Sequence, residues 1–251
     1  MVFPYIFFIE KSERNRYNKS QEMRSFMREL KHPPVCVEHN GTLSYGGCQT
    51  WSESPVMSRC GCGVVSSLDL LIYLADHHSE CNRADFPDEL LFDVVREKVY
   101  DAACRKLSRR YLPLMYPFGI NGLTLVLGLN LFFVRHGFPY RAFWGVRRRE
   151  LWDRIDGMLA QDLPVILSIG PNFPRVWEKK NASLYSLRLD GSLHPAAATH
   201  SHFLTVTGMD EQWLTVSSWG RKYYISRKEY EDYVSENSNG LFSSIVCIQK
   251  K

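Results

Sequence analysis

The hydrophobic pattern of this chain changes its period near residue 164, and that change limits the fold more than any other feature. Before it, apolar residues recur every three or four positions, as in amphipathic helices. The predicted helices cover residues 18–30, 62–75, 87–109, 123–135 and a short stretch at 155–159. After it, short apolar runs predict strands over residues 164–170, 203–208, 213–218, 222–225 and 243–248, with a helix over 227–234. Helices followed by antiparallel strands indicate an α+β protein.

The composition is that of an ordinary globular protein. Its 251 residues are 45% hydrophobic, which is enough apolar material for a sizeable core. The net charge of +4 is small and dispersed, so we expect no nucleic-acid partner. Residues 114–134 are apolar over a length near that of a membrane span, but Pro, Gly and Asn interrupt them, so we expect no span. The apolar N-terminus lacks the basic region and cleavage site of a signal peptide, so we expect a cytoplasmic protein.

The seven cysteines point to chemistry rather than to disulfides. An odd number of cysteines in a chain of this size is not the pattern of a secreted disulfide framework. Cys62 lies in the first turn of a predicted helix, with Gly61 and Gly63 on either side. A helix N-terminus favours a thiolate over a thiol and offers a backbone N–H to a developing oxyanion. We therefore expect Cys62 to have a lowered pKa and to act as a nucleophile.

A nucleophilic thiol needs a base, and the predicted hairpin provides two histidines. Its strands flank a four-residue loop at 209–212. If residue 209 pairs with residue 212, His202 at the start of the first strand lies beside Ser217 and Ser218 of the second. His200 is two residues earlier and would point to the same face, so it is the alternative base.

Four segments together resemble a known family of enzymes. The Gly-Cys-Gly sequence at residues 61–73 resembles the nucleophile helix of papain-fold bacterial cysteine peptidases, and is most similar to the double-glycine leader (bacteriocin-processing) peptidases. Residues 45–51 resemble the glutamine segment that precedes that helix, and residues 202–208 resemble the histidine strand. The Ser-Ser-Trp-Gly of residues 217–220 resembles the Asn-Ser-Trp-Gly of papain-like enzymes.

The resemblance implies a papain-like fold, in which a helical lobe carrying the nucleophile packs on an antiparallel sheet carrying the histidine. Cys62 would be the nucleophile, His202 the general base and then acid, and Gln49 a side-chain donor in the oxyanion hole. Ser217 stands where the family has Asn or Asp as the partner of the histidine. A hydroxyl accepts a hydrogen bond but cannot stabilise an imidazolium as a carboxylate does, so Asp210 is an alternative partner.

The implied function is hydrolysis of an amide bond in a peptide or amide substrate through a thioester intermediate, with no cofactor and no metal. The hydrolase domain would cover residues 44–251, after an N-terminal extension of residues 1–43 with one amphipathic helix. The irregular segment 173–199 leads into the histidine and is expected to form a mobile wall or lid over the site.

Four alternatives to hydrolysis remain open. A papain-fold acyltransferase would pass the thioester to an amine, and a binding or regulatory module would keep the fold with little or no turnover. A zinc site could use Cys48, Cys60 and Cys62 with His200 or His202, although their spacing lacks the usual knuckle. Cys60 and Cys62 could also form a redox pair, but C-x-C is not the C-x-x-C motif.

Overall fold

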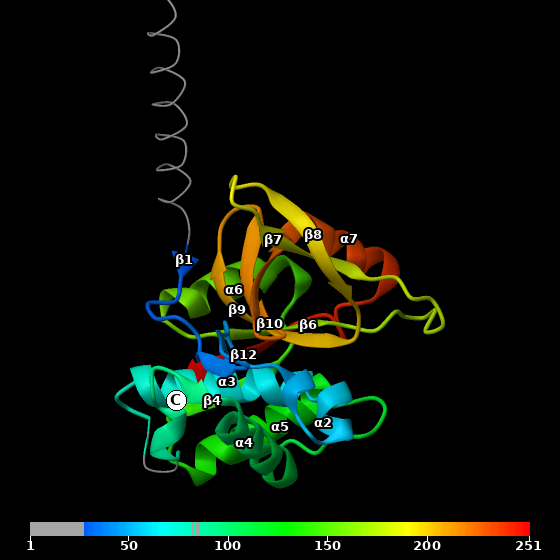
Figure 1. Cartoon of the computed structure of the whole chain (residues 1–251). Coiled ribbons are helices and arrows are strands. Elements are labelled where there is room, and N and C mark those ends of the chain that lie inside the picture. The colour runs from blue at the N-terminus through cyan, green and yellow to red at the C-terminus, as the bar shows by residue number, and fades with distance from the viewer. Residues whose placement is uncertain (1–27, 82, 84–85) are drawn as a thin grey trace, which may run out of the picture.

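A layer of helices lies beneath a large antiparallel sheet in the computed structural model, which describes residues 28–81, 83 and 86–251 (Figure 1). The architecture is mixed α+β, as the change of period predicts. Most of the helix predicted over residues 18–30 lies outside the described residues. At its C-terminal end, Arg28 and Glu29 form the short strand β1 (Arg28–Glu29) instead.

The helical layer contains α2 (Pro55–Cys60), α3 (Cys62–His77), α4 (Glu97–Arg110) and α5 (Gly122–Arg135). The helices predicted from residues 62 and 123 are therefore confirmed as α3 and α5. The helix predicted from residue 87 is wrong at its start, because η2 (Asp88–Leu90) and β4 (Val95–Arg96) precede α4. Val95 is fully buried, and β4 pairs in parallel with β2 (Val37–His39), so tertiary pairing overrides the helical periodicity.

The large sheet has nine strands in the described part of the chain, in the order β5-β12-β6-β9-β10-β11-β7-β8, with β1 also paired to β9. Helices α6 (Leu151–Ala160) and α7 (Arg227–Asn237) pack against it. Its strands, besides β1, are β5 (Tyr140–Trp144), β6 (Val165–Ile169), β7 (Ala182–Leu187), β8 (Leu193–Thr199), β9 (His202–Met209), β10 (Trp213–Ser218), β11 (Arg221–Ser226) and β12 (Ile245–Lys250).

Strand β9 is the centre of this arrangement. All eight of its residues are buried, with β6 on one side and β10 on the other, and α3 and α6 both pack against it. A strand covered on both faces is mostly apolar, as β9 is after His202, with Thr205 and Thr207 as its other polar residues. The start of β9 therefore lies deep in the molecule, beside the helical layer.

The β9–β10 hairpin is confirmed, but its register differs from our prediction. Met209 pairs with Leu214 rather than with Gln212, and a bulge between Thr215 and Val216 then shifts the pairing by one residue. Asp210 sets the turn, because its carboxylate accepts the backbone N–H groups of Gln212 and Trp213. Three residues separate the strands instead of four.

The segment over residues 173–199 is more regular than we predicted. Its second half forms the antiparallel strands β7 and β8, which extend the sheet beyond β11. The expectation of an irregular segment is therefore wrong for residues 182–199, because β7 pairs with β11 and β8 pairs with β7 at the edge of the sheet. A mobile wall or lid over the site stays a prediction.

Residues 28–43 contribute to both sheets. β1 pairs with the end of β9, and β2 pairs with β3 (Thr42–Leu43) and β4 in a small second sheet. The domain boundary placed at residue 44 stays a prediction. Within the described ranges, no helix combines the length and the apolar character needed to cross a bilayer.

Candidate active site

The two glycines around Cys62 are required by close packing at the start of α3. Gly61 ends α2 and begins α3, and a Cβ at this position would lie 2.4 Å from the carbonyl oxygen of Met57. A Cβ on Gly63 would lie 2.5 Å from Ile120 and 3.2 Å from the ring of Phe203 in β9. The Gly-Cys-Gly sequence therefore lets α3 begin directly against β9.

The thiol of Cys62 is half-buried and faces the start of β9. The backbone N–H of Phe203, the residue after His202, donates a hydrogen bond to it. Burial raises the pKa of the Cys62 thiol, while the N–H groups of Phe203, Gly63 and Cys62 itself act in the opposite direction and only partly offset burial. Our expectation of a lowered pKa is therefore wrong for this state, because desolvation outweighs the helix N-terminus.

His202 is the first residue of β9, is buried, and is enclosed by two residues of the hairpin. Its Nε2 is 2.8 Å from the Oγ of Ser218, and the indole of Trp219 stacks on the imidazole at 4.5 Å between ring centroids. Burial lowers the pKa of His202 from 6.5 to about 4. The imidazole is therefore neutral at physiological pH, and no hydrogen bond among the described residues occupies its Nδ1.

The residue that contacts His202 is Ser218, not Ser217 as we expected. Side chains alternate between the two faces of a strand, so a shift of one residue in register exchanges the two serines. Past the bulge, Ser217 pairs with Thr205, on the face opposite to the His202 side chain. Ser217 instead donates a hydrogen bond to the backbone carbonyl of Tyr45 at 2.8 Å.

The two alternate residues lie elsewhere. The Nδ1 of His200 is 2.6 Å from the side chain of Asn181, and Ser201, with a φ of 51°, breaks the alternation between His200 and His202. Asp210 lies at the far end of β9 from His202 and holds the hairpin turn. Neither residue shares the surroundings of Cys62.

The glutamine segment is tied to both α3 and the hairpin. The N–H of Gly47 donates to the carboxylate of Asp69 in α3, at 3.2 and 3.1 Å from its two oxygens. The backbone of Gly220, just after Trp219, exchanges hydrogen bonds with the segment: the Tyr45 N–H donates to its carbonyl, and its own N–H donates to the Gly47 carbonyl, both at 2.9 Å. The structure thus brings the three motif segments together.

Gln49 begins the short helix η1 (Gln49–Trp51) and is buried. No hydrogen bond to its side-chain amide is found in the part of the chain that the structure describes, and Gln49 lines a small void together with Tyr100 and Cys104. The segment is in place beside α3, but the oxyanion role of the Gln49 amide stays a prediction.

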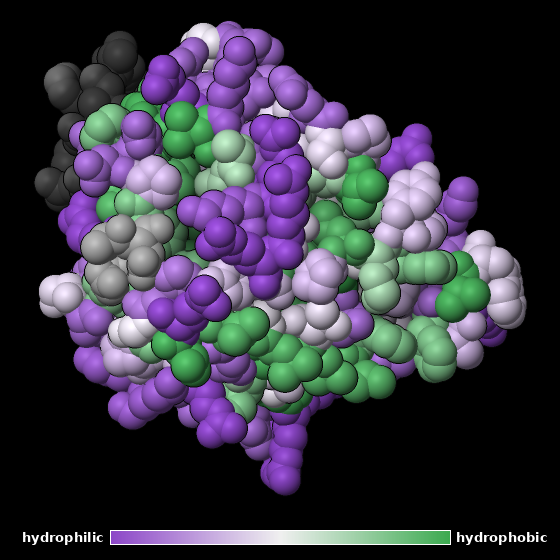
Figure 2. Space-filling view, turned by 90° about the horizontal axis from the view of Figure 1, so that it is seen from below, coloured by the Kyte–Doolittle hydropathy of each residue, from purple (hydrophilic) through white to green (hydrophobic). Residues whose placement is uncertain are grey.

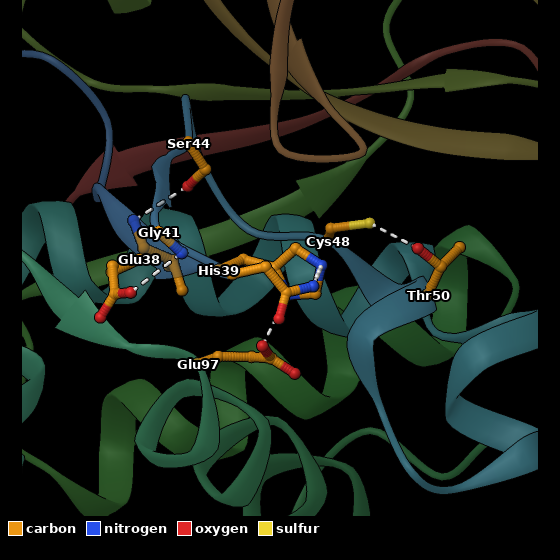
Figure 3. A network of polar contacts seen from close by, with 9 residues as sticks. Glu38, His39, Gly41, Ser44, Cys48, Thr50 and Glu97 are labelled. Carbon is orange, nitrogen blue, oxygen red and sulfur yellow. Dashed lines mark hydrogen bonds and ion pairs between the residues drawn. The ribbon is translucent and has the colours of Figure 1, made fainter.

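A second polar network fixes η1 on its other side (Figure 3). The Nδ1 of His39 in β2 lies 2.5 Å from the carboxylate of Glu97 in α4, and the His39 ring stacks on Trp51 at 4.8 Å. The thiol of Cys48 is 3.0 Å from the hydroxyl of Thr50. Cys48 therefore belongs to the support of the glutamine segment.

Trp219, which the predicted hairpin pairing places opposite His202, covers the imidazole with its indole. Sequence reasoning missed one residue of this site, Asp69. Asp69 is buried in the middle of α3, where a carboxylate amid apolar residues indicates a specific partner. Neither partner of Asp69, Gly47 or Tyr100, is close to it in sequence.

Among the described residues, no group of three His, Cys, Asp or Glu side chains is placed to hold a metal ion. The zinc alternative would need Cys48, Cys60 and Cys62 to meet a histidine, and their thiols do not form such a group. All seven cysteines are free thiols. The C-x-C pair, Cys60 and Cys62, is therefore reduced in this structure.

No protein-family model matches the sequence, and a comparison with curated proteins finds no match. The features that bear on function are therefore Cys62, His202 and the glutamine segment.

Proposed function

We propose that the protein is a cysteine-dependent hydrolase of papain-like fold, a peptidase or amidase that cleaves an amide bond through a thioester intermediate. One observation carries the proposal: the Cys62 thiol at the start of α3 accepts a hydrogen bond from the backbone N–H of Phe203, the residue that follows the buried His202 in β9. The Nδ1 of His202 has no hydrogen-bond partner among the described residues. The α+β architecture, with a helical layer against an antiparallel sheet, is compatible with that fold.

In this mechanism the Nε2–H of His202 donates to Ser218, which leaves Nδ1 as the acceptor. Nδ1 takes the proton of Cys62, and the thiolate attacks the carbonyl carbon of the substrate. The imidazolium then gives its proton to the leaving amine as the C–N bond breaks. A water molecule, deprotonated by the same nitrogen, hydrolyses the thioester and releases the acid.

The oxyanion of each tetrahedral intermediate would accept the backbone N–H of Cys62 and the side-chain amide of Gln49. One such donor contributes about 3 kcal/mol to lowering the barrier. Asp69 and Gly220 form hydrogen bonds with the backbone that precedes Gln49, and these hold the backbone of the glutamine segment in place.

The pair rests in its neutral form. The raised pKa of Cys62 and the lowered pKa of His202, about 4, favour a thiol beside a neutral imidazole over an ion pair at neutral pH. Proton transfer therefore accompanies attack rather than preceding it. Ser218 gives the imidazolium no negative charge, and we expect slower turnover than with a carboxylate or amide partner.

A second candidate is a binding or regulatory module with little turnover. The observation that favours it is the partner of His202: a neutral hydroxyl beside a buried imidazole, covered by Trp219, stabilises the charged form poorly. Acyl transfer is a variant of the first mechanism, in which an amine takes the place of the water.

The test is the reactivity of Cys62 in the full chain at neutral pH, measured with iodoacetamide and mass mapping. Cys36 is the matched control, since it is the other cysteine that is not fully buried. We expect Cys62 to react faster than Cys36, and His202→Asn to slow Cys62 about 100-fold without affecting Cys36. Cleavage of a fluorogenic peptide library by the wild type, lost in Cys62→Ser, would support the hydrolase over the binding or regulatory module. If Cys62 and Cys36 are alkylated at equal rates, and His202→Asn does not change the rate at Cys62, the catalytic pair is refuted.

A further inference from the structure

Helix α5 is apolar on the face that it exposes as well as on the face that it buries. Its outward residues recur at intervals of four, four and three, which places them in one stripe along the helix. The exposed fractions are 60% for Leu123, 70% for Leu127, 54% for Leu131 and 69% for Val134. An exposed helix normally carries polar residues on this side, so the stripe calls for a partner.

The loop before α5 extends the stripe. Met115, Tyr116 and Phe118 are 55%, 56% and 86% exposed. With the four residues of the helix, they make up what we call the α5 surface. Figure 2 looks at the helical layer from outside and shows a hydrophobic band across this face, next to a cluster of hydrophilic side chains.

The segment that contains α5 carries charges of one sign, although carboxylates of other segments, Glu38, Glu89 and Glu97, line a cavity beside its cations. Residues 102–149 contain nine Lys and Arg and no Asp or Glu, although the whole chain carries a net charge of only +4. In the described part of the chain Lys106, Arg109 and Arg110 of α4 form no ion pair with a carboxylate. Two of them, Lys106 and Arg110, line a cavity of about 830 Å³ that Phe132 of α5 also lines, so the cationic and apolar residues belong to neighbouring elements.

We propose that this face docks on an anionic lipid bilayer, with the α5 surface in the interface and the cations of α4 on the headgroups. A helix with an apolar stripe and flanking Lys and Arg lies in the plane of such an interface. Phosphate headgroups supply the negative charge that residues 102–149 lack. A nucleic acid would match the cations but leave the seven apolar side chains against water.

The proposal does not depend on the proposed function, but it places the bilayer near the candidate site. The loop of the α5 surface touches the segment before the nucleophile: the Cys60 thiol donates to the carbonyl of Pro117 at 3.3 Å. Beside it, a Cβ on Gly119 would lie 3.1 Å from the carbonyl of Cys60. A docked protein would therefore hold Cys62 close to the membrane surface.

The experiment is co-sedimentation of the full chain with vesicles, at low and at high salt. We expect the protein to pellet with vesicles of equal parts phosphatidylcholine and phosphatidylglycerol and to stay in solution with phosphatidylcholine alone. High salt should release it, because the interaction of the cations with the headgroups is screened. Tryptophan emission upon vesicle titration would give the dissociation constants.

Two double variants divide the contributions. Arg109→Gln with Arg110→Gln should weaken binding by about 30-fold, from about fivefold per cation at the surface. Leu127→Gln with Leu131→Gln should weaken it by about tenfold or more through lost apolar contact. The matched controls lie at the β7–β8 hairpin: Leu187→Gln with Leu189→Gln, at 55% and 111% exposure, should change nothing. Thermal unfolding verifies that each variant folds.

Several outcomes would overturn the proposal. One is the absence of binding to anionic vesicles, or equal binding to both vesicle types. Another is a concentration-dependent dimer, seen by analytical ultracentrifugation and abolished by Leu127→Gln, which would make a second copy the occupant. Salt-sensitive binding of duplex DNA that is tighter than vesicle binding would assign the cations to nucleic acid instead. None of these measurements uses enzymatic activity. Failure of the membrane proposal would therefore not contradict the proposed hydrolase, and failure of the hydrolase proposal would not contradict membrane docking.

Discussion

At the scale of single residues, the site depends on which of two adjacent serines meets the histidine. Ser218 lies on the face of β10 that His202 shares, whereas Ser217 lies on the other face and binds the glutamine segment. The two adjacent serines therefore have different roles: Ser218 contacts the imidazole, and Ser217 holds the loop before Gln49.

Exchanging each serine for alanine should separate these tasks. Ser218→Ala removes the partner that orients His202 and should slow alkylation of Cys62; it should also cost about 1–3 kcal/mol of unfolding free energy, because the buried Nε2–H is left unpaired. Ser217→Ala removes a buried hydrogen bond to Tyr45 and should cost about 1 kcal/mol of unfolding free energy, with a smaller effect on Cys62. Labelling rates and urea unfolding measure the two effects. A larger rate effect from Ser217→Ala would contradict the contact that we describe.

His202 should make stability depend on pH. Its pKa of about 4 lies below the value of 6.5 for an exposed histidine, so between these values the unfolded chain binds the proton and the native state does not. Stability contributed by His202 is therefore lost as pH falls from 6.5 to 4, by about 3 kcal/mol. Urea unfolding of wild type and His202→Gln across this range should show the difference. His200→Gln, which removes the neighbouring histidine beside Asn181, is the matched control for the exchange.

At the scale of elements, α3 holds the glutamine segment as well as the nucleophile. Asp69 is buried seven residues beyond Cys62 and accepts hydrogen bonds from the Gly47 N–H and from the Tyr100 hydroxyl, the latter at 2.5 Å. Burial raises the pKa of Asp69 from 3.8 to about 6, because these donors only partly replace water. One helix thus fixes two of the three motif segments.

Asp69→Asn should have the opposite pH signature to the histidine variant. Between pH 3.8 and 6 the native state holds the Asp69 proton and the unfolded chain has released it, so this contribution to stability is lost as pH rises. Relative to Asp69→Asn, wild type should therefore lose about 3 kcal/mol over that interval. A difference between the two proteins that is flat with pH would show that Asp69 is not desolvated as the structure describes.

At the scale of the whole molecule, the site is a junction between the helical layer and the sheet. Cys62 belongs to α3, His202 to β9, and Gly63 is the point where these elements come closest. Their separation is set by the packing of the two layers, with Trp144 of β5 seated against Gly122 of α5 further along the same interface.

Gly63→Ala should disturb this junction. The added methyl would overlap Ile120 and press on Phe203, with an expected loss of about 1–3 kcal/mol in unfolding free energy and slower alkylation of Cys62. Gly157→Ala in α6 is the matched control, because its Cβ meets nothing within 4 Å and alanine favours a helix over glycine. Equal stability of both variants in urea unfolding would contradict the close approach of α3 to β9.

Local patterns in the sequence determined the elements that carry the site. The period of the apolar residues was sufficient for α3, α5, β6 and the β9–β10 hairpin, because burial on one face leaves a regular trace along the chain. The glycines beside Cys62 permit the close contacts at the start of α3, since only a missing side chain leaves room for them. The start of α4 was missed because pairing between β4 and β2 depends on residues far apart in the chain.

Tertiary structure alone decided which groups meet at Cys62. One extra residue in β9, opposite Thr215 and Val216 of β10, shifts the register so that Ser218 faces His202, because side chains alternate between the two faces of a strand. Burial between the two layers raises the pKa of Cys62, and this effect outweighs the helix N-terminus, which favours the thiolate. The sequence determines the elements through local periodicity, whereas contacts and burial at the site depend on how distant segments pack, which no local pattern records.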